Sequence, residues 1–182
     1  WNADLFREIA ILSIEGVRKG HCNSYSWNDV WWTRDEFFSA AANTNIIHDI
    51  LKKQLQDKVL AEKAEASAIW LQIEALSKQL ICNDIHLQEA IRVSCTYGRI
   101  KYQLIEQMWK IMIAEGCYQQ NIAINNQEIK KVITKYDHLW TEWKSLKQSS
   151  PWCATLYTDM AFRNQRKGSI GELVNKWKKQ IQ

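Results

Sequence analysis

The sequence predicts an all-α protein, an antiparallel bundle of three long helices with shorter helices at the N- and C-terminal ends. Two observations lead to this fold class. The 182 residues include one proline and six glycines, which leaves few residues for the turns of a β-rich fold. Apolar residues also recur every three or four positions over long stretches, which is the spacing of an amphipathic helix.

A single domain is expected over residues 1–182. The hydrophobic content of 46% is enough for one compact core in a chain of this length, and 24% of charged residues is ordinary for a folded protein. Because the chain starts at Trp1 rather than at a methionine and shows no signal-like segment, we expect that it was cut from a longer product. No run of about 18 apolar residues is present, so the sequence excludes a transmembrane helix.

Short helices are predicted near the N-terminus. Residues 4–17 carry apolar side chains on one face, and Gly16 and Gly20 are expected to bracket the end of this helix. A capping-box motif predicts a second short helix over residues 34–42.

Three long helices are predicted next. The first spans residues 45–82, which contain neither glycine nor proline, and the second spans residues 85–115, after a turn at Asn83 and Asp84. Gly98 is expected to mark a close helix crossing or a kink, because glycine is unfavourable inside a helix.

The remaining helix ends are predicted from glycine, proline and capping residues. Gly116 is expected to end the second long helix. The third long helix is predicted to begin at Asn125 and to stop shortly before Pro151. A final short helix is predicted from Ser169 to the end of the chain, with Glu172 as the reciprocal capping partner.

Motifs for catalysis or cofactor binding are absent from the sequence. None of the four histidines follows a glutamate by three residues, which excludes a helix-borne di-iron site, and HExxH, a glycine-rich phosphate loop and a GxSxG elbow are also missing. We therefore assign no catalytic residue, no cofactor and no metal to this chain. A pair of carboxylates for glycoside hydrolysis stays open, because such a pair depends on separation in three dimensions.

The cysteines are odd in number, widely spaced and without a CxxC pair, so they predict neither a disulfide framework nor a zinc site. Buried free thiols are expected, since cysteine commonly serves as a small core residue. A neighbouring cysteine and histidine, such as Cys82 and His86, would supply a nucleophile only with suitable geometry. The five cysteines are Cys22, Cys82, Cys95, Cys117 and Cys153.

The ten tryptophans fall into two groups. One group lies on or near apolar helix faces and is expected in the core, whereas the other lies in short or irregular segments beside Asp, Asn and Arg. An aromatic face stacks on a sugar ring while planar polar groups bond the hydroxyls, so the second group is a candidate oligosaccharide site. The alternative is that these tryptophans seal the end of the bundle or dock on a neighbouring domain. The expected core group is Trp70, Trp109, Trp140 and Trp143, and the candidate ligand-binding residues are Trp27, Trp31, Trp32, Arg34, Asp35 and Trp152.

Positive charge is concentrated near the C-terminus. Residues 160–182 contain six lysines or arginines and a single acidic residue, whereas the whole chain carries a net charge of +4. Such a segment could contact nucleic acid or an acidic partner. Because Lys176, Lys178 and Lys179 fall in the last turns of a helix, where cations suit the dipole, nucleic acid is not expected as a partner.

Two stretches, "SWNDVWWTRDEFFSAAANT" (residues 26–44) and "SPWCATLYTDMAFRNQRKGSIGEL" (residues 150–173), resemble the helical C-terminal region of bacterial proteins that carry a glycoside-hydrolase-type barrel upstream. The resemblance implies a bacterial, multidomain, carbohydrate-active parent protein in the periplasm or the cytoplasm. It also implies that an upstream domain of the same protein is the main partner. It assigns no catalytic residue to this chain, because the catalytic groups of such proteins belong to the barrel.

Two functions follow. The first is a helical accessory domain of a larger carbohydrate-active bacterial protein, which docks on a catalytic domain or lines a saccharide site. The alternative is a self-standing helical protein–protein interaction module with no carbohydrate role. An enzyme that acts alone ranks third.

Overall fold

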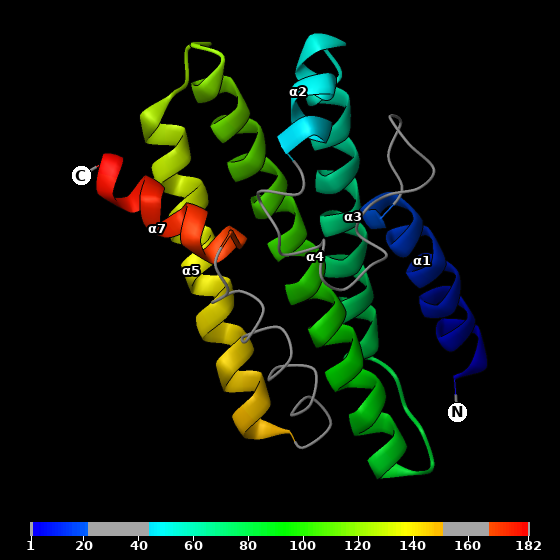
Figure 1. Ribbon diagram of the computed structural model, residues 1–182. Helices are drawn as coiled ribbons and strands as arrows, with labels where there is room; N and C mark the ends of the chain where they lie inside the picture. Colours follow the sequence, from blue (N-terminus) through cyan, green and yellow to red (C-terminus); the bar gives the residue numbers. More distant parts are fainter. Residues whose placement is uncertain (1, 22–43, 151–167, 182) are drawn as a thin grey trace.

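The computed structural model describes residues 2–21, 44–150 and 168–181, and the regular elements in these residues are all α-helices (Figure 1). This confirms the all-α fold class. Three of the helices are long and pack together. The helices are α1 (Ala3–His21), α2 (Thr44–Lys52), α3 (Gln56–Ser77), α4 (Ile85–Gln119), α5 (Asn126–Ser149) and α7 (Ile170–Gln180).

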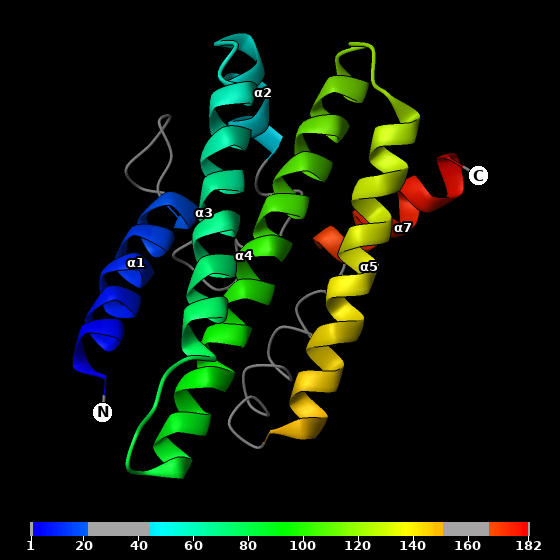
Figure 2. The ribbon, with the colours of Figure 1, turned by 180° about the vertical axis from the view of Figure 1, so that it is seen from behind.

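Helix α4 lies at the centre of the structure. It packs against α3 on one side and against α5 on the other, and α1 packs against the far side of α3 (Figures 1 and 2). The short helices α2 and α7 both contact α4, and α7 also contacts α5. Among the helices described, none is long and apolar enough to cross a membrane.

The prediction of one continuous helix over residues 45–82 is wrong, because α2 and α3 are separated by a break. Gln54 has a left-handed backbone with a φ of 56°, its N–H donates to the Leu51 carbonyl, and the Leu55 N–H donates to the Ile50 carbonyl. These two bonds form a Schellman motif, which usually places glycine at the left-handed position. The break allows α2 to pack its apolar face on α4 in a direction different from that of α3.

The prediction that Gly116 ends α4 is also wrong. The helix continues to Gln119, and Asn121 follows in the left-handed region with a φ of 56°. Asparagine tolerates this conformation better than most residues. Gly116 instead makes room for α2, since a Cβ built there would lie 2.5 Å from Cγ2 of Ile47.

Three further glycines make room for an aromatic pair. Gly16 and Gly20 lie inside α1 rather than beyond its end, so that prediction is wrong. A Cβ at Gly16 would lie 2.5 Å from Nε1 of Trp70, and one at Gly20 would lie 2.1 Å from Cε1 of Tyr102. The close crossing predicted at Gly98 is confirmed, because a Cβ there would lie 2.1 Å from Cζ3 of Trp70. The rings of Trp70 and Tyr102 stack with their centroids 5.0 Å apart.

The predicted N-caps are confirmed at three helices. The side chains of Asp84 and Asn125 each accept hydrogen bonds from two backbone N–H groups in the first turns of α4 and α5. Ser169 accepts a bond from the Glu172 N–H at the start of α7, and the Glu172 carboxylate accepts one from the Gly168 N–H. The predicted helix over residues 34–42 lies outside the described residues.

The four tryptophans expected in the core pack there. Trp109 and Trp143 are buried, whereas Trp70 and Trp140 are half-buried against the core. Lys63 is also fully buried.

Lys63 joins the C-terminal end of α1 to α3. Its ammonium donates to the carbonyls of Lys19 (3.3 Å) and Gly20 (3.0 Å) and lies 5.5 Å from the centroid of the Trp109 ring. A cation at this position satisfies carbonyls that have no partner within the helix and suits the helix dipole.

Candidate functional site

The residues predicted to bind a ligand lie outside the described residues. Five of them fall in residues 22–43 and the sixth in residues 151–167, so the predicted sugar site stays a prediction. These residues are Trp27, Trp31, Trp32, Arg34, Asp35 and Trp152.

Two of the three described thiols, Cys95 and Cys117, do not resemble activated nucleophiles. Cys82, Cys95 and Cys117 are free, and burial raises the pKa of the Cys95 and Cys117 thiols, which disfavours the reactive thiolate. Within residues 2–21, 44–150 and 168–181, no group of three or more His, Cys, Asp or Glu side chains is placed to hold a metal ion.

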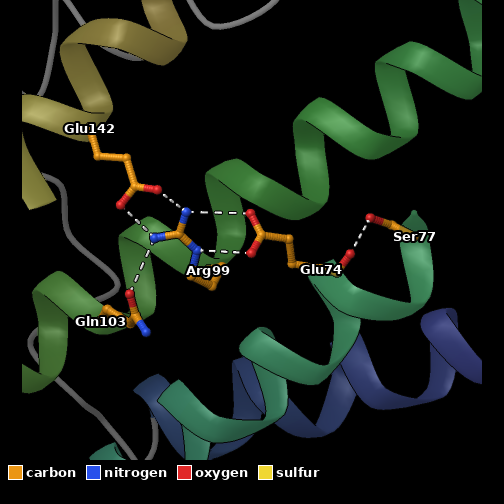
Figure 3. A network of polar contacts seen from close by, with 5 residues as sticks. All are labelled: Glu74, Ser77, Arg99, Gln103 and Glu142. Carbon is orange, nitrogen blue, oxygen red and sulfur yellow. Dashed lines mark hydrogen bonds and ion pairs between the residues drawn. The ribbon is translucent and has the colours of Figure 1, made fainter.

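A buried ionic network joins the three long helices (Figure 3). Arg99 of α4 is buried, and its guanidinium bonds the Glu74 carboxylate of α3 at 3.2 and 3.3 Å. The same group donates to both carboxylate oxygens of Glu142 of α5, at 2.7 Å to Oε2, and to Oε1 of Gln103 at 3.2 Å. The N–H groups of Arg99 are therefore all used in hydrogen bonds that connect α3, α4 and α5. The role of this side chain is structural.

The network changes how its members bind protons. The hydrogen bond from Arg99 lowers the pKa of Glu142, against the smaller opposing effect of burial, and the positive charge of Arg99 adds to the lowering. Burial tends to lower the pKa of Arg99, but the bonds and charges of Glu142 and Glu74 outweigh it and raise the pKa. Arg99 and Glu142 therefore stay charged at neutral pH.

Unfolding experiments at several pH values test the contribution of Glu142. Because its pKa is lower in the folded state, the carboxylate stabilises the fold fully above its ordinary pKa of 4.5, and this stabilisation is lost as the pH falls through the lower folded value. We expect Glu142→Gln to reduce the free energy of unfolding most at about pH 7 and progressively less below pH 4.5, as measured by urea denaturation.

Glu128→Gln is the matched control on the same helix, because Glu128 is exposed and lies 3.8 Å from Lys131. This substitution should change stability little at any pH. A loss for Glu142→Gln that is the same at every pH would contradict the role of the charge.

The connection between α3 and α4 is held from α4 by Arg92. Its guanidinium donates to the carbonyls of Ser77 (3.2 Å), Lys78 (3.0 Å) and Leu80 (3.0 Å). These carbonyls belong to or follow the last turn of α3, where no helical N–H is available to bond them. One side chain thus fixes the backbone at the end of α3.

Two further side chains hold the rest of this connection. Asn2 donates to the Gln79 carbonyl at 3.1 Å and accepts a bond from the Ile81 N–H at 3.0 Å. Gln88 accepts a bond from the Cys82 N–H at 2.8 Å. Together with the N-cap at the start of α4, these bonds define one backbone conformation.

Three large apolar side chains of this connection and of the first turn of α4 are exposed to solvent. Ile81 and Ile85 are each 64% exposed, and Leu87 is 45% exposed, whereas Leu80 is fully buried. We call residues 78–87, with these three exposed side chains, the apolar tip. The helical periodicity of the sequence did not reveal the apolar tip. Ile81 falls inside the helix that was predicted over residues 45–82, whereas α3 ends before Ile81.

Comparisons with protein-family models, with curated proteins and with solved structures found no match for this chain. Within the described residues, the apolar tip is an exposed surface with the character of a docking site. It presents apolar side chains on a backbone that hydrogen bonds already hold in place.

Proposed function

We propose that this chain is a helical accessory domain of a larger carbohydrate-active bacterial protein and that it docks on the neighbouring catalytic domain through the apolar tip. The supporting observation is that Ile81, Ile85 and Leu87 are exposed on a hydrogen-bonded backbone. Exposed large apolar side chains favour association, and a backbone fixed before binding lowers the entropy lost on docking.

In this proposal α3, α4 and α5 form an antiparallel bundle that serves as a stiff arm. Successive helices joined by short connections favour reversal of direction, and the connections on either side of α4 are short. The apolar tip then occupies one end of the arm, where a neighbouring domain has access to it.

The carbohydrate part of the proposal rests on the resemblance of residues 26–44 and 150–173 to helical regions of glycoside-hydrolase-type proteins. In this function the upstream barrel would supply the catalytic groups. Trp31, Trp32 and Trp152 remain the proposed sugar contacts from the irregular segments of the sequence.

A self-standing protein–protein interaction module is the second candidate. Helix α1 exposes Ile11 and Ile14, which lie one turn apart and are 61% and 71% exposed. Arg7 and Arg18 flank them at helical spacing. An apolar pair between basic residues on one helix is suited to the groove of a separate partner.

Hydrogen exchange tests docking at the tip in the full-length gene product and in the isolated chain. Amides of residues 78–88 should exchange about tenfold more slowly in the full-length product, because the docked domain suppresses local opening. The double substitution Ile81→Asn with Ile85→Asn should remove this protection. It should change the unfolding free energy of the isolated chain by less than about 0.5 kcal/mol, because both side chains are exposed.

Ile11→Asn with Ile14→Asn is the matched control, since it replaces two equally exposed isoleucines on α1. Docking at the tip requires that this control retain the slow exchange of residues 78–88. Slow exchange on α1 instead, lost in the control variant, would place the docked domain on α1 rather than at the tip. Equal exchange of the tip in both proteins would refute docking there.

A further inference from the structure

A pocket of about 400 Å³ lies between α2, α4 and α7. Its apolar floor is formed by Ile47, Met112 and Leu173, one residue from each helix. Its volume falls in the range of small-molecule sites. The polar lining residues are His48, Glu115, Gln119, Ser169, Glu172 and Lys176.

This pocket is remote from the apolar tip. Glu115 lies in the last turns of α4, whereas Ile85 begins that helix. At 1.5 Å per residue, the two positions are about 45 Å apart along the helix axis. A ligand in the pocket and a domain docked at the tip would therefore not compete.

Three donors fix the carboxylate of Glu115 at the edge of the pocket. Oε1 accepts bonds from Lys176 Nζ (2.6 Å) and Gln119 Nε2 (2.9 Å), and Oε2 accepts a bond from the indole N–H of Trp177 (3.0 Å). A carboxylate offers about four acceptor positions, so one position remains for a ligand. Because the donors come from α4 and α7, the carboxylate is oriented before any ligand arrives.

His48 extends this network across the pocket to α2. Its Nε2 lies 3.1 Å from Oε1 of Gln119, whose amide N–H₂ already donates to Glu115. The amide oxygen can only accept, so His48 Nε2 donates to it. Lys176 keeps ammonium protons beyond the one it gives to Glu115, and its side chain is 44% exposed. The lining thus supplies both donors and acceptors.

The charged side chains of the pocket are two carboxylates and one ammonium group. Lys176 pairs with Glu115, whereas the carboxylate of Glu172 accepts the neutral backbone N–H of Gly168. An anionic ligand would therefore meet an excess of negative charge. A neutral ligand with several hydroxyl groups would find partners for them.

We propose that this pocket binds a neutral sugar ring. Hydroxyl groups of the ring accept a bond from Lys176 and donate to the remaining position on Glu115, and the C–H face of the ring packs on Met112 and Leu173. Such a division between an apolar floor and a polar rim matches the amphipathic faces of a pyranose. The inference does not depend on docking at the apolar tip, and it uses none of the tryptophans of residues 22–43.

Titration of ¹⁵N-labelled protein with single sugars tests the pocket. The reporter is the indole N–H of Trp177, which bonds Glu115; Trp177→Phe identifies its signal among the ten tryptophans. The neutral probes are glucose, galactose, mannose and N-acetylglucosamine, and the anionic probes are glucuronate and galacturonate. Glucose or galactose should shift this signal saturably and bind about tenfold more tightly than its anionic counterpart, because the added carboxylate meets the excess of negative charge in the pocket.

Lys176→Met removes a donor from the exposed rim and should weaken binding of that sugar about tenfold or more, as expected for a hydrogen bond to a charged group. Lys179→Met is the matched control, because it is exposed, lies on the same helix and does not line the pocket. This control should bind as the unmodified protein does. Thermal unfolding of both variants shows that the fold is retained.

Three results would overturn the assignment: no neutral sugar shifts the Trp177 signal, an anionic sugar binds as tightly as its neutral counterpart, or Lys176→Met binds normally. The last result would place the sugar elsewhere on the protein. The Ile81→Asn and Ile85→Asn variant should bind the sugar normally. Failure of docking and failure of sugar binding are therefore observed separately.

Discussion

Arg99→Ala is expected to destabilise the protein by about 3–5 kcal/mol, the usual effect of removing one partner from a buried ionic network. The guanidinium is the single cation between Glu74 of α3 and Glu142 of α5 in the network of Figure 3. Without the guanidinium, the carboxylates of Glu74 and Glu142 face each other with no cation between them, and Glu74 is almost buried. Urea denaturation at neutral pH, followed by far-ultraviolet circular dichroism, measures the loss.

Arg7→Ala is the control for this prediction, because Arg7 is exposed and pairs with Asp4 at 3.4 Å. Its effect should stay below about 1 kcal/mol. A further variant combines Arg99→Met with Glu74→Gln and Glu142→Gln and should recover a large part of the lost stability, since no charge is then left unpaired. A loss below about 1 kcal/mol for Arg99→Ala would show that the network contributes little.

Gly98→Ala is expected to destabilise the protein by roughly 2 kcal/mol, although alanine is favoured over glycine in a helix by about 1 kcal/mol. The new Cβ would lie 2.1 Å from Cζ3 of Trp70, far inside van der Waals contact. The indole has no room to withdraw, because Gly16 of α1 contacts its other edge and Tyr102 stacks on its face. The helices α1, α3 and α4 must therefore separate. The resulting decrease in the free energy of unfolding is measured by urea denaturation.

The same substitution in a Trp70→Ala background separates the clash from the helix propensity. With the indole removed, the added methyl group occupies vacated space, and Gly98→Ala should become neutral or stabilising by up to about 1 kcal/mol. The sign of its effect thus reverses between the two backgrounds. Equal destabilisation in both would mean that the backbone, rather than contact with Trp70, requires glycine at this position.

Local signals in the sequence predicted the helical content and several helix starts correctly. Asp84, Asn125 and Ser169 were identifiable because an N-cap bonds N–H groups only two or three residues away. The break at Gln54 was missed, since neither glycine nor proline marks it. The residue adopts a left-handed conformation that the packing of α2 on α4 holds in place.

The functional residues were less predictable than the fold. Aromatic residues beside polar ones marked a candidate sugar site in residues 27–35 and at Trp152, and these lie outside the described residues. Neither the apolar tip nor the pocket at Glu115 has a sequence signal of its own. Exposed isoleucines resemble core isoleucines in a helical pattern, and Glu115 gains two of its three donors from a helix about 60 residues further along the chain.

The sequence by itself determined the all-α class, the core tryptophans and the capped helix starts, because each of these depends on periodicity or on bonds within one helical turn. The tertiary structure alone decided what Gly16, Gly20 and Gly116 do, which side chain meets Gly98, and where Arg99 finds its carboxylates. Those outcomes depend on contacts between residues 25 to 82 positions apart, such as Arg99 with Glu74, Gly16 with Trp70, and Gly20 with Tyr102. Such contacts form only when separate helices come together, and a helical pattern in one segment carries no information about the segment it will meet.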